Sequence, residues 1–264
     1  MKPERLSASH TPSDASLQLV RQSGSKIRSD APELAHWTEN YLREHQQRLA
    51  IDLDLAKAHL KPGARVLDEG AAPLVTTVAL KASGFRVSAV DLAPKRFAGV
   101  IREFDLDVRR CDIEEERLPF ADESFDGVLF NELFEHLRID PIFTLQEVFR
   151  VLAPGGRLLL STPNLRSFRG LKNLLLKDQG HAVSAGVYRQ YEKLKTLGHM
   201  GHVREYTVTE TVDFLGQTGF QPLKVIYRGG YGRGLVGFAE RLAPSMRPFF
   251  SIVAERSANA AESA

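Results

Sequence analysis

The stretch ARVLDEGAAPLVTTVALKASGFRVSAVD (64–91) decides the fold. It opens with a short apolar run (64–70), continues with apolar residues at helical spacing (74–83) and ends with a second apolar run (85–91). Two strands joined by a helix form a crossover unit. Such units build a parallel sheet that is covered on both faces.

The alternation of strands and helices continues along the chain. Further strands are predicted at 107–112, 125–130, 156–162, 222–228 and 249–255, and further helices at 93–104, 140–152 and 208–220. The sequence therefore predicts an α/β protein with one large sheet.

Composition excludes several classes of protein. The 264 residues carry 35 Lys and Arg against 33 Asp and Glu, and a net charge of +2 is too small to indicate nucleic-acid binding. A single cysteine, Cys111, excludes a disulfide scaffold and a cysteine-based zinc cluster. No apolar run approaches the roughly 20 residues of a membrane-spanning helix, and no secretory signal is visible. We expect a cytoplasmic protein.

The chain divides into segments of different character. Residues 1–30 are rich in Ser, Pro, Lys and Arg and are predicted to be a disordered tail, as is 257–264. The domain is expected to span 31–256. Within it, helices over 32–60 and a basic insertion over 164–204 are predicted to cover the ligand site as a lid.

In open parallel sheets, ligands bind beyond the carboxyl ends of the strands. Asp91 ends the second strand about 20 residues after Gly70, where a carboxylate binds the ribose of a nucleoside. An ordinary helix cap explains Asp91 equally well. The first turn, GAAP (70–73), lacks the glycines that a dinucleotide phosphate needs, although the small Ala72 still permits a close ligand. A nicotinamide dehydrogenase is therefore disfavoured.

Four segments together carry a family resemblance. VLDEGAA, VSAVDLAP, CDIEEERLPFADESFDGVLFNELFEHL and VFRVLAPGGRLLLSTPN follow one another between residues 64 and 164. In this order and spacing they resemble class I S-adenosylmethionine-dependent methyltransferases, in the broad bacterial group that includes small-molecule, ubiquinone-pathway and glycan O-methyltransferases. The resemblance implies a Rossmann-like, seven-stranded, mostly parallel sheet with helices on both faces and the last strand antiparallel. It also implies S-adenosylmethionine as the cofactor.

The resemblance implies roles for particular residues. Asp68 and Gly70 match the motif whose backbone lies against the methionine part of the cofactor, and Asp91 matches the ribose-binding acid. Asp112 matches the residue that holds the adenine amino group. The full set implied to bind the cofactor is Asp68, Gly70, Ala72, Asp91, Leu92, Asp112, Ile113, Asn131 and Glu132. The family usually has a second glycine where Ala72 stands.

The acceptor side offers two candidate bases. An oxygen nucleophile needs a general base near neutral pH, and His136 and His202 lie in segments expected at the methyl-transfer site. Ordinary packing histidines are the alternative. Arg204 and Tyr206 are predicted to bind the acceptor, with an ion pair from Arg204 to Glu132, Glu135 or another surface acid as the alternative. No metal site is predicted, because the histidines lack regular ligand spacing.

We therefore expect O-methylation of a small molecule or a glycan, including lipid-linked or nucleotide-linked glycans. NELF (131–134) lacks the prolines that commonly accompany N-methylation of nucleic acids in this superfamily. A non-catalytic binding subunit and an RNA methyltransferase, which the basic insertion would serve, remain alternatives. The apolar and basic segment 232–250 predicts peripheral contact with a membrane, or else a packed helix edge. The oligomeric state stays open.

Overall fold

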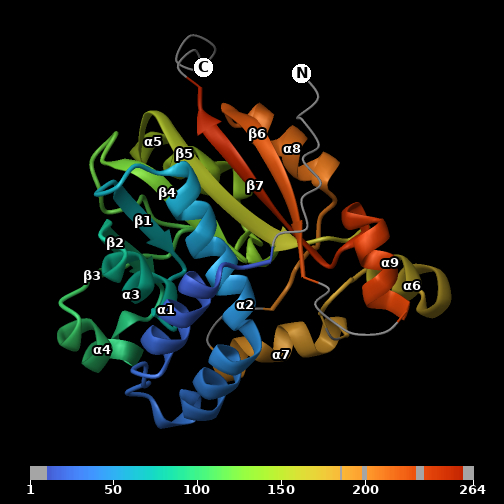
Figure 1. Ribbon diagram of the computed structural model, residues 1–264, viewed down its shortest axis with the longest axis horizontal. Coiled ribbons are helices and arrows are strands. Elements are labelled where there is room, and N and C mark those ends of the chain that lie inside the picture. The colour runs from blue at the N-terminus through green and yellow to red at the C-terminus, as the bar shows by residue number, and fades with distance from the viewer. Residues whose placement is uncertain (1–10, 185, 198–200, 230–234, 258–264) are drawn as a thin grey trace.

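The computed structural model describes residues 11–184, 186–197, 201–229 and 235–257. A seven-stranded sheet in the order β3-β2-β1-β4-β5-β7-β6 runs through the molecule (Figure 1). Its strands are β1 (Arg65–Glu69), β2 (Arg86–Asp91), β3 (Asp107–Arg110), β4 (Phe125–Asn131), β5 (Leu152–Pro163), β6 (Phe220–Arg228) and β7 (Phe249–Arg256). Only β7 runs antiparallel to its neighbours, β5 and β6. The predicted fold is confirmed.

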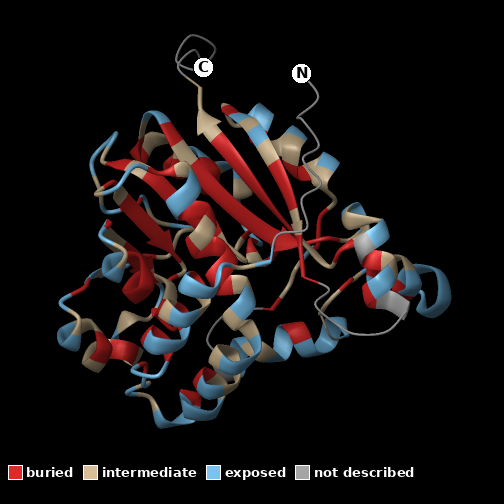
Figure 2. Ribbon diagram, in the orientation of Figure 1, coloured by how far each residue is buried: buried red, intermediate tan, exposed pale blue. Residues whose placement is uncertain are grey.

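Alternate residues of each strand face opposite layers of helices. On β4, Leu129 joins the core on one face, whereas Val128 and Phe130 join the core on the other. The first core is closed by α2 (Ala35–His59), α3 (Val75–Ala82) and the short α4 (Ala98–Glu103), which follows the 3-10 turn η2 (Pro94–Phe97). The second is closed by α5 (Pro141–Val151) and α8 (Val208–Gln217). Figure 2 shows the buried strands between these layers.

Helix α1 (Asp14–Gly24) corrects the prediction of a disordered tail over 1–30. Ser13 caps this helix by accepting a hydrogen bond from the amide of Ser16, and its own hydroxyl donates to Asp54 on α2. Val20 and Ile27 are almost fully buried in the first core. Few large apolar residues mark this segment, so its stability comes from tertiary packing on α2 and α3 rather than from a strong helical pattern. Residues 1–10 and 258–264 lie outside the described part of the chain.

The predicted helix over 32–60 is present as η1 (Pro32–Leu34) and α2. The second half of α2 is buried in the core, and its first half extends past the carboxyl ends of the central strands. The turn η3 (Phe134–His136) follows β4 at the same edge of the sheet. These two elements bring side chains from distant parts of the sequence to one place.

The segments around β5 and β7 form a wing beside this edge. Helices α6 (Phe168–Lys177) and α7 (Val187–Leu197) occupy the predicted insertion, and α9 (Leu235–Leu242) with η4 (Pro244–Met246) precedes β7. Asn164 ties the wing together, because its side-chain amide donates to the carbonyls of Ser245 (3.0 Å) and Arg247 (2.8 Å). Among the described residues, no helix is both long and apolar enough to cross a bilayer.

The membrane contact predicted for 232–250 needs correction in its second half. Phe249 and Phe250 begin β7, where sheet pairing and packing bury Phe250 completely, and Arg247 is also buried. Among the side chains of this segment that the structure describes, the exposed large apolar ones are those of Phe238 and Leu242 on α9. Residues 230–234 lie outside the described part of the chain.

Candidate functional site

A cleft of about 820 Å³ lies at the carboxyl ends of β1, β2 and β4. This volume is within the range of small-ligand sites. Its lining comes from the first half of α2, from the turns after the three strands and from the wing. Of the predicted cofactor residues, the cleft is lined by Gly70, Ala72, Asp91, Leu92, Asp112, Ile113, Asn131 and Glu132.

Gly70 shapes the floor of the cleft. It has a φ of +63°, and a Cβ at this position would lie 2.4 Å from Cδ2 of Leu133. Any larger residue would be strained by its backbone conformation and would displace Leu133. Gly70 therefore lets Leu133 pack directly against the backbone at the end of β1, although the turn holds fewer glycines than is usual.

Asp91 links two turns at the cleft. Its carboxylate accepts hydrogen bonds from the backbone amides of Ala72 (Oδ2, 3.1 Å) and Ala93 (Oδ1, 2.8 Å). A carboxylate has about four acceptor positions, so two amides leave capacity for further donors. The two interpretations of Asp91 are compatible, since one carboxylate can both cap the local turn and face a ligand.

Asp112 and Ile113 follow β3 on the same wall. The Asp112 carboxylate accepts from the amide of Glu114 (3.2 Å), while Thr144 of α5 donates to the carbonyl of Ile113 (3.0 Å). The turn is therefore fixed at both residues. An acceptor beside an apolar side chain suits a flat heterocycle that carries an amino group.

Asp68 is the predicted cofactor residue whose side chain does not line the cleft. It is 4% exposed, and the Thr77 hydroxyl donates to its Oδ2 at 2.7 Å. Burial raises the pKa of Asp68 to about 7, against the lowering effect of Thr77, and the nearby charges of Asp52 and Asp91 add to the rise. The carboxyl group faces α3, so only its backbone remains available for the role that the family resemblance implies.

A buried charge network holds Glu132 at the end of β4. Arg48 of α2 forms an ion pair with its Oε2 (2.8 Å), and Arg228 at the end of β6 contacts its Oε1 (2.9 Å). Arg228 is 1% exposed and also pairs with Asp52 at 2.5 Å. Burial alone would raise the pKa of Glu132, but Arg48 and Arg228 lower it below its usual range. Glu132 thus keeps its charge at the mouth of the cleft.

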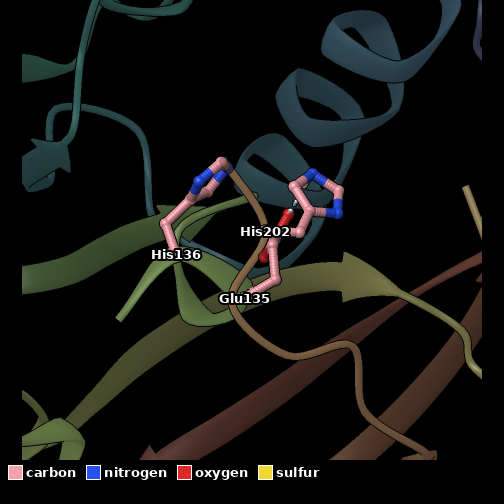
Figure 3. A group of neighbouring side chains, drawn as sticks. All are labelled: Glu135, His136 and His202. Atoms are coloured by element: carbon pink, nitrogen blue, oxygen red, sulfur yellow. Dashed lines mark ion pairs between the residues drawn. The ribbon is translucent and has the colours of Figure 1, made fainter. Parts of the chain in front are cut away.

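His136, His202 and Glu135 lie close together beside this network (Figure 3). The ring of His202 packs edge-on against that of His136, with 4.9 Å between centroids. His202 Nδ1 lies 3.0 Å from Oε1 of Glu205, which is 2% exposed and also accepts from the backbone amides of Ala182 and Ser184. This carboxylate favours a proton on Nδ1, so Nε2 keeps its lone pair for another proton.

Glu135 differs from Glu132 and Glu205 because, in the part of the chain that the structure describes, it has no ion-pair partner that lowers its pKa below the usual range. Its side chain is completely buried, Thr162 donates to its Oε2 (2.9 Å), and its Oε1 has no hydrogen-bond partner among the described residues. Burial and the neighbouring charge of Glu132 hold the pKa of Glu135 well above its usual range. The raised pKa favours the protonated form of this carboxyl group, which lies 4.0 Å from Nε2 of His202.

The same three side chains are the candidate for a metal ion. Their nearest ligand atoms lie within 4.8 Å of one another, with 4.0 Å between Glu135 and His202. Bonds of about 2.0–2.1 Å in a tetrahedral site place neighbouring ligand atoms roughly 3.3 Å apart. An ion would therefore have to draw these side chains together, so we treat them as an acid–base group.

The structure does not bring Arg204 and Tyr206 to the cleft, which corrects the prediction that they contact the acceptor. Arg204 forms an ion pair with Glu210 (2.6 Å), and its guanidinium lies over the Tyr206 ring. Tyr206 is 8% exposed, and its ring packs on that of Phe134 with 4.4 Å between the ring centroids. Glu210 belongs to the capping box of α8, so the local helix start supplies the partner of Arg204.

The segments predicted to cover the site as a lid, 32–60 and 164–204, supply further cleft residues. Helix α2 contributes Tyr41, His45 and Arg48, and the wing contributes Arg169 and Lys193. Burial and the charge of Arg48 lower the pKa of His45 to about 4, so this histidine is neutral. Glu205 was missed, and its separation of three residues from His202 was the one available signal.

Three comparisons with known proteins agree with this geometry. Residues 34–225 match the model of a family described as a methyltransferase domain. The chain is 40% identical over 120 residues to a demethylmenaquinone methyltransferase of Mycobacterium sp. (strain KMS), which covers 44% of this chain and 50% of that protein. It is 35% identical over 120 residues to a ubiquinone biosynthesis O-methyltransferase of Xanthomonas oryzae pv. oryzae (strain PXO99A), and the match covers 43% of this chain and 49% of that protein.

The chain thus spans about half the length of the curated relatives it matches. Among solved structures, it is similar to the 1,6-didemethyltoxoflavin-N1-methyltransferase of Burkholderia thailandensis with bound 1,6-didemethyltoxoflavin and S-adenosylhomocysteine. The TM-score is 0.56 at 19% identity, and the match covers 96% of this chain and 94% of that one. This likeness shows the fold.

Proposed function

The chain belongs to the methyltransferase domain family that matches residues 34–225, and we propose that it transfers a methyl group from S-adenosylmethionine to a hydroxyl group of a small-molecule acceptor. One observation carries the proposal. Asp91 and Asp112 line one side of the cleft at the strand ends, and the His202–Glu205 pair supplies a general base on the same cleft. A donor site and a base thus share one cleft.

The residues present fit S-adenosylmethionine. Gly70 lines the cleft at the end of β1, and Asp91 has free acceptor positions for the ribose hydroxyls. Asp112 and Ile113 suit the adenine amino group and ring. The bound cofactor would supply an electrophilic methyl group on a sulfonium.

The acceptor half of the reaction falls to His202. Nε2 removes the hydroxyl proton as the oxygen attacks, and Glu205 stabilises the resulting positive charge on the ring through Nδ1. Glu205 also accepts from the amides of Ala182 and Ser184, so the base and part of the cleft wall have the same anchor. In-line methyl transfer depends mainly on positioning, which a rigidly held base supports.

We propose a small-molecule acceptor rather than a glycan because the two curated relatives are named for demethylmenaquinone and for ubiquinone biosynthesis. We propose oxygen as the methylated atom because a paired histidine base fits a hydroxyl. A carbon or nitrogen acceptor is the alternative that the experiment must distinguish.

The test combines the purified chain with S-adenosylmethionine carrying an isotopically labelled methyl group and a panel of phenols, catechols and hydroxyquinones. Release of S-adenosylhomocysteine identifies an acceptor, and NMR of the product identifies the atom that carries the label. We expect an O-methyl product, formed at similar rates by wild type and by the surface control His36→Ala and about 10²-fold or more slowly by His202→Ala. A methyl group on carbon or nitrogen would overturn the proposed chemistry.

A further inference from the structure

We propose that α6, α7 and α9 form a docking surface for a lipid bilayer with anionic headgroups. The described residues include thirteen exposed large hydrophobic side chains, of which three lie on α6, four on α7 and two on α9. These nine are Leu174, Leu175, Leu176, Val187, Tyr188, Tyr191, Leu194, Phe238 and Leu242. In Figure 1, α6 and α9 lie at the right of the molecule, and α7 lies toward the bottom.

Helix α6 is the clearest part of this surface. Leu175 and Leu176 are 76% and 75% exposed, and the preceding Leu174 is 48% exposed. The buried Asn173 anchors the helix by donating to the carbonyl of His181 (2.9 Å). Three consecutive exposed leucines on an anchored helix form an apolar patch of the kind that marks an interaction site.

Charge identifies the occupant. Helix α6 carries Arg169, Lys172 and Lys177 with no acidic residue between its ends, and α7 carries three basic residues against the single acid Glu192. Leucine and tyrosine side chains interspersed with cations are typical of helices that lie in the headgroup region of a membrane. Each cation near an anionic bilayer contributes about 1 kcal/mol of attraction.

A second copy of the chain fits this surface poorly. A twofold dimer would place the same patch on both sides of the interface. The cations of α6 and α7 would then face one another, with one acid on α7 to offset them. An anionic lipid surface offers the complementary charge together with an apolar layer for the leucines.

The docking surface is continuous with the cleft. Arg169 of α6 and Lys193 and Leu194 of α7 line the cleft, so the residues that would meet lipid adjoin those that enclose a ligand. Asn164 anchors the chain before α6 to the segment after α9, which keeps the parts of the wing in register. Docking would thus place the mouth of the cleft at the lipid surface. Docking itself does not depend on the proposed methyl transfer.

The experiment is co-sedimentation of the full chain with vesicles of phosphatidylcholine, with or without phosphatidylglycerol, at low and high salt. We expect binding to the vesicles that contain phosphatidylglycerol, at least about tenfold weaker binding to phosphatidylcholine alone, and weakening by salt. The double variant Leu175→Glu/Leu176→Glu should lose at least about tenfold in binding. The control Ile139→Glu/Ile142→Glu makes the same change of charge at two exposed residues outside the wing (49% and 52% exposed) and should bind like wild type.

Circular dichroism and S-adenosylhomocysteine binding establish that each protein is folded. Folded wild type that fails to sediment with anionic vesicles at low salt would overturn the proposal. So would equal loss of binding in the two double variants. A dimer in gel filtration that Leu175→Glu/Leu176→Glu dissociates, without any vesicle binding, would assign the surface to a second copy and overturn it as well.

Discussion

The imidazole of His202 is held by the buried carboxylate of Glu205, with 3.0 Å between Nδ1 and Oε1. The Glu205 carboxylate also accepts hydrogen bonds from the backbone amides of residues 182–184, which precede α7. One acid therefore anchors both the candidate base and the chain that leads into α7. The pKa of Glu205, which burial alone would raise, is lowered by His202 and by these amides. A charged Glu205 keeps His202 in one orientation.

The first prediction concerns this pair. Removing the base in His202→Ala should lower the rate of methyl transfer by about 10²-fold or more, because proton transfer from the acceptor loses its catalyst. Glu205→Gln should lower the rate at least tenfold, because the amide cannot stabilise the charged ring as a carboxylate does. Steady-state kinetics and calorimetry with S-adenosylhomocysteine measure rate and cofactor affinity separately.

Cofactor affinity should stay within about twofold of wild type in both variants, since neither residue is assigned to the donor site. His36→Ala is the control, because His36 is exposed on α2 and does not line the cleft. Full activity in His202→Ala would remove this residue from the mechanism. His136, whose ring packs against it, would then be the next base to test.

Chelation tests the interpretation of the same group as an acid–base site. His202, His136 and Glu135 stand too far apart to share an ion as they are placed, so activity should be unchanged after treatment with EDTA. The assay is methyl transfer before and after chelation and gel filtration. Loss of activity that zinc or magnesium restores would show that an ion draws the three side chains together.

The buried network around Arg228 should dominate local stability. Arg228→Met removes the buried ion-pair partner of Asp52 and one of the two partners of Glu132. We expect a loss of about 3–5 kcal/mol in the free energy of unfolding. Arg65→Met is the matched control, because its ion pair with Asp126 is partly exposed and is worth about 1 kcal/mol or less. Urea denaturation measures both. Equal losses would contradict the role given to burial.

The stability of the protein should also report the titration of Asp68. Its pKa of about 7 lies above that of the unfolded chain, roughly 3.9, so the folded state binds the proton more tightly. The stabilisation that results is complete below the unfolded pKa and is lost as the pH rises through 7.

Asp68→Asn removes this titration while its side-chain oxygen still accepts from Thr77. Between pH 5 and pH 8, wild type should therefore lose roughly 2–3 kcal/mol of unfolding free energy that the variant does not lose. Urea denaturation at the two pH values gives the difference, with the exposed Asp213→Asn as control. Parallel pH profiles for wild type and Asp68→Asn would contradict the raised pKa.

The strands were predictable because their signals are local. Apolar runs such as that at 85–91 end at turn residues, and β2 (Arg86–Asp91) lies where the pattern placed it. Helix α1 was not predictable, because its burial depends on α2 and α3 rather than on its own few apolar residues. The local sequence pattern therefore identifies elements that have a hydrophobic face of their own. It misses elements, such as α1, whose stability depends on packing against other helices.

The site divides in the same way. Asp91 and Asp112 were found because the strand ends of a parallel sheet converge, which topology alone dictates. Arg48 and Arg228 reach Glu132 from α2 and β6, and no sequence spacing encodes that meeting. For Arg204 the alternative of an ion pair with a surface acid is the correct one, since its partner, Glu210, lies six residues away at the start of α8 and not at the cleft.

The most direct test of the central claim is calorimetry with S-adenosylhomocysteine on three proteins: wild type, Asp91→Asn and the control Asp213→Asn. We predict binding in the micromolar range by wild type and by the control. Asp91→Asn should bind about 100-fold more weakly, because its amide replaces a carboxylate that accepts the ribose hydroxyls. Thermal unfolding establishes that the variants are folded. Folded wild type that does not bind, or Asp91→Asn that binds as wild type does, would contradict the assignment of this cleft to the cofactor.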